Sequence, residues 1–469
     1  LAEKPQAESV SGGLDLSASG LRFDRADWQA SVPSLVWGGD FQKEPDRPLS
    51  FQSSATLEDA ELEDRGRQLK ITQLSGQFPW HWPQSESRPE GNFTIGGLHW
   101  AGKSLGPVKG TLRQEGREYK VTATHTNRLL NGLPVHLAGT ASLRPDYSLQ
   151  AELSTPWRDL DSLALDRFHP AAAGMRLSGR LKAAGSIEIT PQKATGSLRT
   201  ELRNGLFEHQ QREGQVEGIE TTLFLADLFG LKSAPAQRLR FEQATLGRLN
   251  FGAGELVYQL EESGSVLLEQ SDLRWSEGHL RMYAFRLPPA SEGYRTIIHC
   301  DRLKIAEILR QLGLAQAEGE GEVSGLIPLT ITKGDLLFGK GFLYSTPGEG
   351  GFLKVKDAER LADYIPGSAP RLSQIEFAIE ALRNFEYNWL KIFFETKGED
   401  LLLQLQLDGK PAEPLPFTFD TELGTLVRLE GEGAAGSRHP IRLDINFRLP
   451  LNELLFYGTG IRQLLDRLQ

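Results

Sequence analysis

Apolar and polar residues alternate along most of the chain. From residue 441 to residue 449 every second residue is apolar, and the residues between them are polar or charged. Because successive side chains of a β-strand point to opposite faces, this spacing predicts strands with one apolar and one polar face. The same alternation occurs at residues 401–407, 327–331 and 119–123.

Short turns that contain glycine separate many of these predicted strands. Asn131-Gly132, Asn204-Gly205 and Lys333-Gly334-Asp335 each stand beside alternating segments. Such residues adopt the backbone conformations that tight hairpins need. The pattern therefore predicts a mainly β chain whose strands are joined as hairpins.

Helical spacing is confined to a few short segments. Leu303 to Leu312 places its apolar residues on one face of a helix, and Trp157 to Phe168 is similar. The segment from Ser373 to Asn388 begins with a serine that can cap a helix, and Leu451 to Leu468 is a further candidate. We expect only a few short helices.

An internal repeat follows two of these helical segments. Strand patterns at 175–190 and 194–208 follow the first, and strand patterns at 321–332 and 339–355 follow the second. Repeats that cannot bury their own apolar face stack into an extended sheet or a solenoid. We predict an N-terminal segment at 1–156, a middle repeat at 157–300 and a C-terminal repeat region at 301–469, as separate parts or as one continuous structure.

Composition excludes several classes of protein. The chain has 52 Lys and Arg residues against 62 Asp and Glu residues, and its basic residues form no run, so nucleic acid is not an expected partner. No apolar run approaches the roughly 20 residues that a membrane-spanning helix requires. The single cysteine, Cys300, allows no internal disulfide. The start at Leu1, with neither a charged nor an apolar leader after it, indicates a trimmed or processed chain.

One segment matches the spacing of a phosphate-binding P-loop. In GLHWAGKS the matching residues are Gly97, Gly102, Lys103 and Ser104. That chemistry needs a helix directly after the lysine, and the residues that follow, LGPVKG, cannot form one. We therefore predict a hairpin loop here, with a nucleotide enzyme as the alternative that Lys103→Ala tests.

Other candidate sites are weaker. Phe78, Trp80 and Trp82 lie on one face of a predicted strand, where they suit a sugar platform, an acyl-chain lining or ordinary packing within a sheet face. The acidic group at residues 58–64 lacks the spacing of a calcium loop, and the histidines show no zinc spacing. With no nucleophile elbow and no pattern for a catalytic dyad, we expect no enzyme, no cofactor and no metal.

Several segments of the C-terminal third together resemble one family. They are GEVSGLIPLTIT (321–332), GKGFLYSTPGEGGFLKV (339–355), ALRNFEYNWLKIFF (381–394), LLLQLQLDG (401–409) and HPIRLDINFRLPLNELL (439–455). These segments resemble the YdbH family, whose domain carries the older label "dicarboxylate transport" and which groups with the AsmA-like proteins, including TamB. The resemblance covers residue 303 to the end, and upstream it rests on the style of the repeat.

The resemblance implies a fold and a role. The expected fold is a long antiparallel sheet of repeats that curls into an open groove with an apolar inside, together with a few short helices. The expected role is phospholipid transport through the periplasm, from the inner to the outer membrane of a Gram-negative envelope. It also implies an inner-membrane helix outside this sequence and a small outer-membrane lipoprotein as partner. Because exposed strand edges accept an added strand, we expect that partner to pair at the C-terminal edge of the sheet.

The alternating strands supply the residues that would line such a groove. A period-two pattern shows which face is apolar but not what covers it, so a closed core remains the alternative. A carbohydrate-binding or adhesive β-solenoid that uses Trp80, Trp82 and Trp100 is the alternative function. The predicted groove lining is Ile327, Leu329, Ile331, Leu401, Leu403, Leu405, Leu407, Ile441, Leu443, Ile445 and Phe447.

Overall fold

The structure is a computed structural model of the chain. It describes residues 9–44, 47–83, 90–142, 147–168, 172–209, 213–262, 265–287, 293–332, 336–359, 372–422, 425–429, 436 and 438–450. The predicted turn at 333–335 and the predicted helix at 451–468 lie outside these residues.

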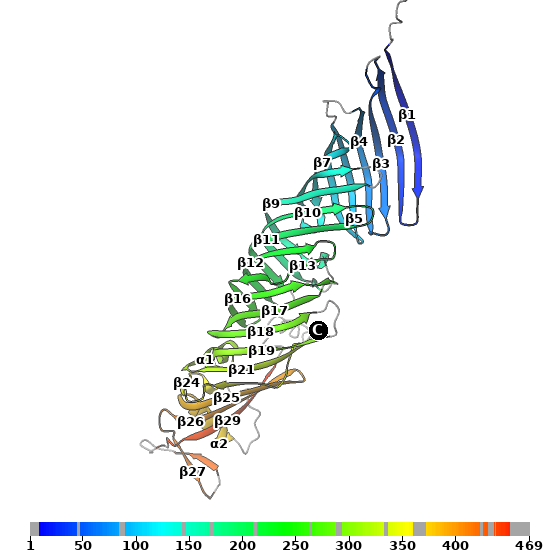
Figure 1. Cartoon of the computed structure of the whole chain (residues 1–469). Coiled ribbons are helices and arrows are strands. Elements are labelled where there is room, and N and C mark those ends of the chain that lie inside the picture. The colour runs from blue at the N-terminus through cyan, green and yellow to red at the C-terminus, as the bar shows by residue number, and fades with distance from the viewer. Residues whose placement is uncertain are drawn as a thin grey trace, which may run out of the picture. The chain divides into compact units, whose positions relative to one another are not determined.

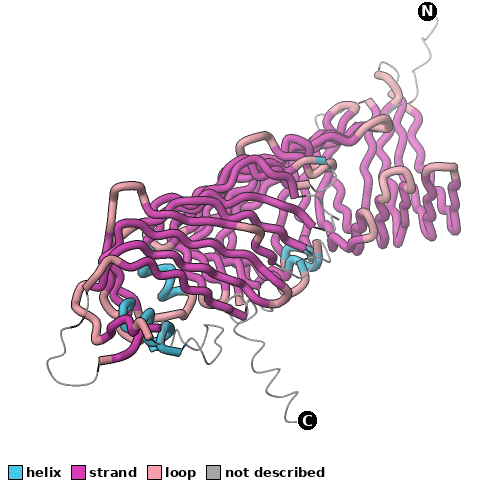
Figure 2. Tube along the Cα trace, turned by 90° about the horizontal axis from the view of Figure 1, so that it is seen from below, coloured by secondary structure: helices cyan, strands magenta, loops and turns pink. Residues whose placement is uncertain are grey.

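Antiparallel strands dominate the fold (Figures 1 and 2). The structure is 75% strand and 7% helix, and 27 of the described strands belong to one sheet. Each strand pairs mainly with its neighbours along the chain, as hairpins require. The predicted class, an extended antiparallel sheet of repeats of the β-groove type with few helices, is confirmed.

The chain divides into two compact units, which we describe separately. Unit 1 contains residues 1–173, 177–203 and 222–233, and unit 2 contains residues 174–176, 204–221 and 234–469. The three segments expected from the repeat stay a prediction.

Unit 1 holds the first nine strands in hairpin order. Beside them it has two 3₁₀ turns, η1 and η2, and a short strand, β13. Three longer strands, β10, β11 and β12, contribute residues to both units. The bounds are β1 Val10–Asp24, β2 Trp28–Lys43, β3 Ser50–Asp64, β4 Leu69–Trp82, β5 Glu90–Trp100, β6 Lys103–Glu115, β7 Glu118–Asn127, η1 Arg128–Leu130, β8 Leu133–Ser142, β9 Ser148–Ala164, η2 Leu165–Arg167, β10 Met175–Ile189, β11 Ala194–His209, β12 Gly214–Asp227 and β13 Lys232–Ser233.

Unit 2 adds the remaining strands and both α-helices. Helix α1 follows β19 directly, and helix α2 precedes β25. The bounds are β14 Gln237–Phe241, β15 Gln243–Leu246, β16 Leu249–Leu260, β17 Val266–Trp275, β18 Gly278–Leu287, β19 Gly293–Lys304, α1 Ile305–Gln311, β20 Ala317–Glu320, β21 Glu322–Thr332, β22 Leu336–Phe338, β23 Gly341–Ser345, β24 Gly351–Val355, α2 Leu372–Leu382, β25 Phe385–Lys397, β26 Asp400–Pro411, β27 Phe417–Asp420, β28 Thr425–Arg428 and β29 Ile441–Pro450. The strands β27 and β28 pair only with each other.

Two of the predicted helices are found. The segment predicted at 303–312 forms α1, and the one predicted to start at Ser373 forms α2. The second prediction ended too late, because α2 ends at Leu382 and β25 begins at Phe385. The turn at Asn131-Gly132 is confirmed, with both residues in the left-handed region.

The helix predicted at 157–168 is wrong. These residues form the end of β9 followed by the 3₁₀ turn η2. Leu160 and Leu163 are both buried although they are three residues apart, which is the spacing of a helix. Between them Ser162 has a φ of 44°, and its amide donates a hydrogen bond to Ser178 Oγ at 3.0 Å. One left-handed residue within a strand therefore produced a helical spacing.

The same arrangement occurs at two other strands. Asp59 in β3 and Arg302 in β19 also have a positive φ, and their amides donate to Ser75 Oγ and Ser324 Oγ, each at 3.0 Å. The pairing register shifts at both places, as it does at a β-bulge. We call these three positions the serine-anchored bulges. A related error concerns Asn204-Gly205, which was predicted as a turn and lies inside β11, where Asn204 has a φ of 48°.

Candidate functional site

The strands of unit 1 place their apolar side chains on one face. Ala18 of β1 pairs with Leu35 of β2, which pairs with Leu57 of β3. Further along, Ala123 of β7 pairs with Leu137 of β8, which pairs with Leu153 of β9. The alternate positions carry serine, threonine, glutamine and charged residues. We call this surface the apolar face of unit 1.

The start of this face is exposed. Leu14, Leu16 and Phe23 of β1 are 45%, 56% and 50% exposed, and no described residue of β1 or β2 is buried. The described residues of unit 1 contain no α-helix that packs on this face. Large apolar side chains without a cover mark a surface that binds an apolar partner.

An aromatic cluster occupies the apolar face across β2, β3 and β4. The rings of Trp37 and Phe51 stack at 5.3 Å between centroids, and Phe51 meets Trp80 at 5.5 Å. Phe78 and Trp82 also belong to this face. Like Trp80, they pair with residues of β3 that lie on it. The prediction that residues 78, 80 and 82 share a face is confirmed. Sequence reasoning missed Trp37 and Phe51, although the alternation at residues 35–41 contains the signal.

Trp100 does not join that cluster. It lies at the opposite end of the strands, where it pairs with Leu69 at the start of β4, whereas Trp80 and Trp82 lie at the end of β4. Its ring makes an edge contact with Phe229 at 6.1 Å between centroids. The three tryptophans proposed as one sugar platform are therefore not brought together.

Most of the predicted groove-lining residues lie in the apolar core of unit 2 or at its margin. The alternation predicted for β26 and β29 is seen, and one face of each strand is buried. Among the eleven, Leu407 is fully buried and Phe447 is 1% exposed, whereas Ile327 and Ile441 are half-buried at the margin. The side chain of Ile331 lies outside the described part. Those that are buried are Leu329, Leu401, Leu403, Leu405, Leu407, Leu443, Ile445 and Phe447.

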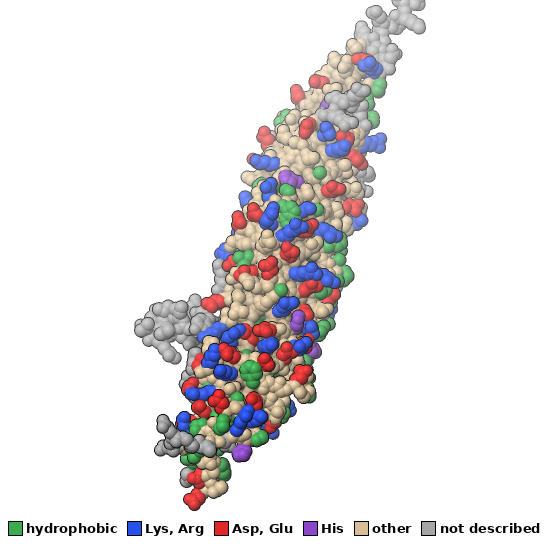
Figure 3. All heavy atoms as spheres, turned by 90° about the vertical axis from the view of Figure 1, so that its left-hand side faces the viewer, with side chains coloured by type: hydrophobic (Ala, Val, Ile, Leu, Met, Phe, Trp, Pro, Cys, Tyr) green, Lys and Arg blue, Asp and Glu red, His purple; other side chains and the backbone are tan. Residues whose placement is uncertain are grey.

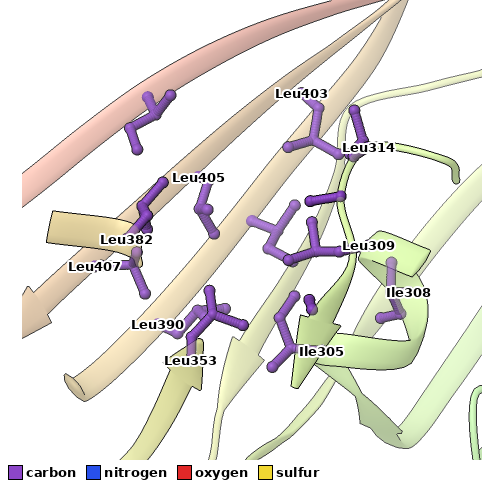
Figure 4. Close-up of a cluster of buried hydrophobic side chains, with 14 of the residues drawn as sticks. Ile305, Ile308, Leu309, Leu314, Leu353, Leu382, Leu390, Leu403, Leu405 and Leu407 are labelled. Carbon is purple, nitrogen blue, oxygen red and sulfur yellow. The ribbon is translucent and has the colours of Figure 1, made fainter. Parts of the chain in front are cut away.

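This core is closed by the chain itself. Ile305, Ile308 and Leu309 of α1 and Leu382 of α2 belong to the same cluster as the leucines of β26. In Figure 4 the side chains from α1 and from β26 point toward one another, and Leu382 lies beside Leu407. Whether these residues ever contact lipid stays a prediction, because in this structure protein side chains surround them.

The polar face carries paired charges. Arg281 of β18 donates hydrogen bonds to Asp272 and to Asp301, both at 3.0 Å, and His279 lies 2.6 Å from Asp272. Burial acts to raise the pKa of Asp272, but the hydrogen bonds with His279 and Arg281 outweigh it and hold that pKa below its usual value. Figure 3 shows acidic and basic side chains interspersed on one side of the molecule. Such a mixed surface suits a protein that stays in water.

The alternative chemistries find no support in the described residues. The P-loop-like segment is a hairpin, as predicted: β5 ends at Trp100 and β6 begins at Lys103, whose ammonium donates to the carbonyls of Arg167 and Phe168. The acidic residues Glu58, Asp59 and Glu61 are exposed on β3. No cluster suited to a metal ion occurs within the described ranges. Burial raises the pKa of the Cys300 thiol to about 12, which makes it unreactive.

A comparison with protein-family models identifies the chain. Residues 5–413 match the model of the YdbH-like family, described as "Intermembrane phospholipid transport protein YdbH". The chain belongs to the YdbH-like family. Members of this family are lipid transport proteins rather than a class of enzymes, and their description places them between two membranes.

The match to the YdbH-like family differs in extent from the sequence resemblance. It includes the N-terminal residues, where the resemblance rested on the style of the repeat, and it ends before the segment at 439–455. No curated protein and no solved structure matched the chain. Within the described residues, no helix has the length and the apolar character needed to cross a membrane.

Proposed function

We propose that this YdbH-like chain carries phospholipid between the inner and outer membranes by holding the acyl chains against its apolar sheet face. The observation that supports this most is the exposed apolar surface of β1 and β2, on which no described helix of unit 1 packs. The chain that carries this surface belongs to a family of phospholipid transport proteins. Each methylene that leaves water on such a face gains about 0.8 kcal/mol. The headgroup stays at the polar margin.

The proposal shifts the main contact region toward the N-terminal strands. Leu16 and Trp37 are neighbours in register on β1 and β2, beside the stacked ring of Phe51. Acyl chains can reach these residues without any rearrangement of the core. The residues of β26 and β29 that were predicted to line the groove would contact lipid only after α1 and α2 move off the sheet.

Photo-cross-linking tests where lipid binds. A photoreactive amino acid at Leu16 should capture phospholipid from vesicles or from the cell, and mass spectrometry of the adduct identifies it. The matched control is Ser17, the next residue of the same strand, which faces the polar side. Equal capture at both positions, or none at Leu16, would reject the apolar face as the binding surface.

We further propose that a small outer-membrane lipoprotein pairs with the edge strand β29. In the described part of the chain β29 pairs with β26 on one side, and no strand is seen on its other side. Such an edge offers free N–H and C=O groups to an added strand. Attachment to the inner membrane through a helix outside this sequence belongs to the same proposal.

Proline substitutions separate this pairing from folding. The N–H groups of Asp444 and Ile445 point to opposite sides of β29, because successive residues of a strand do so. Proline at the residue whose N–H faces the free edge should abolish capture of the lipoprotein. It should leave the melting temperature within a few degrees of the parent. If both single variants still bind the lipoprotein, β29 is not the docking strand.

A further inference from the structure

Two contacts join opposite margins of the sheet in unit 1. Because each strand runs antiparallel to the one before it, the turns alternate between two margins. The turns after β3 and β5 lie at the first margin. The turns before β9, after β10 and after β12 lie at the second margin. Contacts between the two sets of turns therefore span the sheet from one margin to the other.

Arg67 makes the first of these contacts. It lies in the turn after β3, where Asp64 accepts hydrogen bonds from its backbone amide at 2.9 Å and from Nη1 at 3.1 Å. Nη1 also donates to the hydroxyl of Tyr147 at 2.7 Å. Nη2 donates to the carbonyls of Thr190 and Pro191, the latter at 2.9 Å. One planar guanidinium thus joins both margins with several charge-assisted hydrogen bonds.

Trp100 and Phe229 make the second contact. Trp100 ends β5 at the first margin, and Phe229 follows β12 at the second. The turn that holds Phe229 is fixed by Asp227, which accepts hydrogen bonds from the amides of Phe229 and Gly230 at 3.1 and 3.0 Å. The Phe229 ring also packs close to Gly196, where an added methyl group would lie 3.4 Å from the ring and 2.8 Å from the carbonyl oxygen of Ser186.

The contact of Arg67 with Thr190 and Pro191 spans as many strands as the contact of Trp100 with Phe229, whereas Tyr147 lies two strands earlier. From the turn after β3 to the turn after β10 the chain passes the seven strands β4 to β10. From the turn after β5 to the turn after β12 it passes the seven strands β6 to β12. Twist between neighbouring strands accumulates along a sheet, and Figure 1 shows β1–β3 upright but β9 running nearly horizontally. These contacts indicate that the sheet of unit 1 winds so that turns about seven strands apart meet.

Burial along the apolar face agrees with this winding. Leu112, Ala123 and Ala151 of β6, β7 and β9 are buried, although no described helix of unit 1 packs on them and they are not part of the core of unit 2. The equivalent face of β1 and β2 has no buried residue. Winding of the sheet on itself accounts for burial of one part of the face and exposure of the other.

We propose that these contacts form a seam that closes the side of the apolar face, that Arg67 is the positioning residue of the seam, and that acyl chains therefore enter unit 1 from the β1–β3 end. This inference rests on the function proposed above. It assigns a path to the lipid and a role to Arg67, Tyr147, Trp100 and Phe229.

The seam itself is tested without lipid. A cysteine placed at Ala123, which is 9% exposed, reports access to the enclosed face, and a cysteine at Leu14 reports the exposed part. Cys300 is replaced by alanine throughout. In Arg67→Ala, maleimide labelling at position 123 should become about tenfold faster, since loss of the hydrogen bonds favours local opening. Labelling at position 14 should not change.

Two further variants cover the case in which Arg67→Ala fails to fold. Arg67→Lys keeps the charge without the planar fork, so labelling at position 123 should lie between those of the parent and Arg67→Ala. Phe229→Ala removes the second contact only and should also speed that labelling. Labelling at position 123 that stays at the parent rate in every folded variant would overturn the seam.

The path of the lipid is tested by blocking one end. A photoreactive residue at Leu137, on the apolar face of β8, reports arrival of phospholipid from vesicles. A bulky polyethylene glycol adduct on Leu14→Cys should abolish this capture in the parent and not in Arg67→Ala, where the side is open. Capture that persists in the blocked parent would overturn entrance from the β1–β3 end. Absence of capture in the unblocked protein would instead reject the proposed function.

Discussion

The β1–β3 part of unit 1 and the core of unit 2 present the same alternation of apolar and polar residues with opposite results. In β26 the apolar positions are enclosed by α1, α2 and neighbouring strands. In β1 the apolar positions are half exposed, and no helix among the described residues of unit 1 packs on them. The comparison shows that a period-two pattern defines a face, and that the segments which pack on that face decide whether it becomes a core or a binding surface.

The largest expected difference is the effect of a buried charge. Leu407→Asp places a carboxylate at a fully buried position and should lower the free energy of unfolding by more than about 4 kcal/mol. Leu16→Asp, at a position that is 56% exposed, should cost less than about 0.5 kcal/mol. Urea denaturation measures both. A cost of several kcal/mol at Leu16 would mean that the face of β1 is covered in solution.

Two glycines provide a second comparison. A methyl group at Gly321, which has a φ of 136°, would lie 1.6 Å from the hydroxyl of Tyr387, and that hydroxyl donates a hydrogen bond to the carbonyl of Glu320. Gly321→Ala should therefore lower the free energy of unfolding by about 2–3 kcal/mol. Gly20→Ala has free space and only an unfavourable φ of 67°, so about 1 kcal/mol is expected. Similar costs at both sites would show that the packing around Tyr387 is loose.

The pH dependence of stability should differ between the two units, because the single cysteine, Cys300, lies in unit 2. Burial raises the pKa of Cys300 to about 12, so the folded state keeps its proton while the unfolded state loses it above about pH 9. The stabilisation is complete below that pH and is lost as the pH rises toward 12. At pH 10 the loss is on the order of 1 kcal/mol. Cys300→Ala should remove this contribution, which denaturation of both proteins at pH 8 and pH 10 would reveal.

The smallest effects concern the serine-anchored bulges. Ser75→Ala in unit 1 and Ser324→Ala in unit 2 each remove the acceptor for one bulge amide. Both should lower the free energy of unfolding by about 1 kcal/mol, since each loses one hydrogen bond. Hydrogen exchange at Asp59 and Arg302 checks the local effect. A loss in one unit only would show that the three bulges are not equivalent.

The sequence predicted which residues share a face better than it predicted what the face does. The alternation at Leu401–Leu407 and Ile441–Leu449 is found in β26 and β29, since strand geometry requires only the order of residues. The helix predicted at 157–168 failed, because the bulge at Ser162 spaces Leu160 and Leu163 as a helix does. The enclosure of β26 depends on α1, which is nearly 100 residues away along the chain. No local pattern reports such a contact.

The serine-anchored bulges also bear on how such a chain can change in length. Insertion of one residue into a strand normally turns every later side chain to the wrong face of the sheet. A left-handed residue held by a serine of the next strand takes up the extra residue, and Ala60, Leu163 and Leu303, which follow the three bulges, all remain buried. Single-residue insertions at these places can therefore be tolerated during evolution. A strand can lengthen by one residue while its apolar side chains stay on the same face of the sheet.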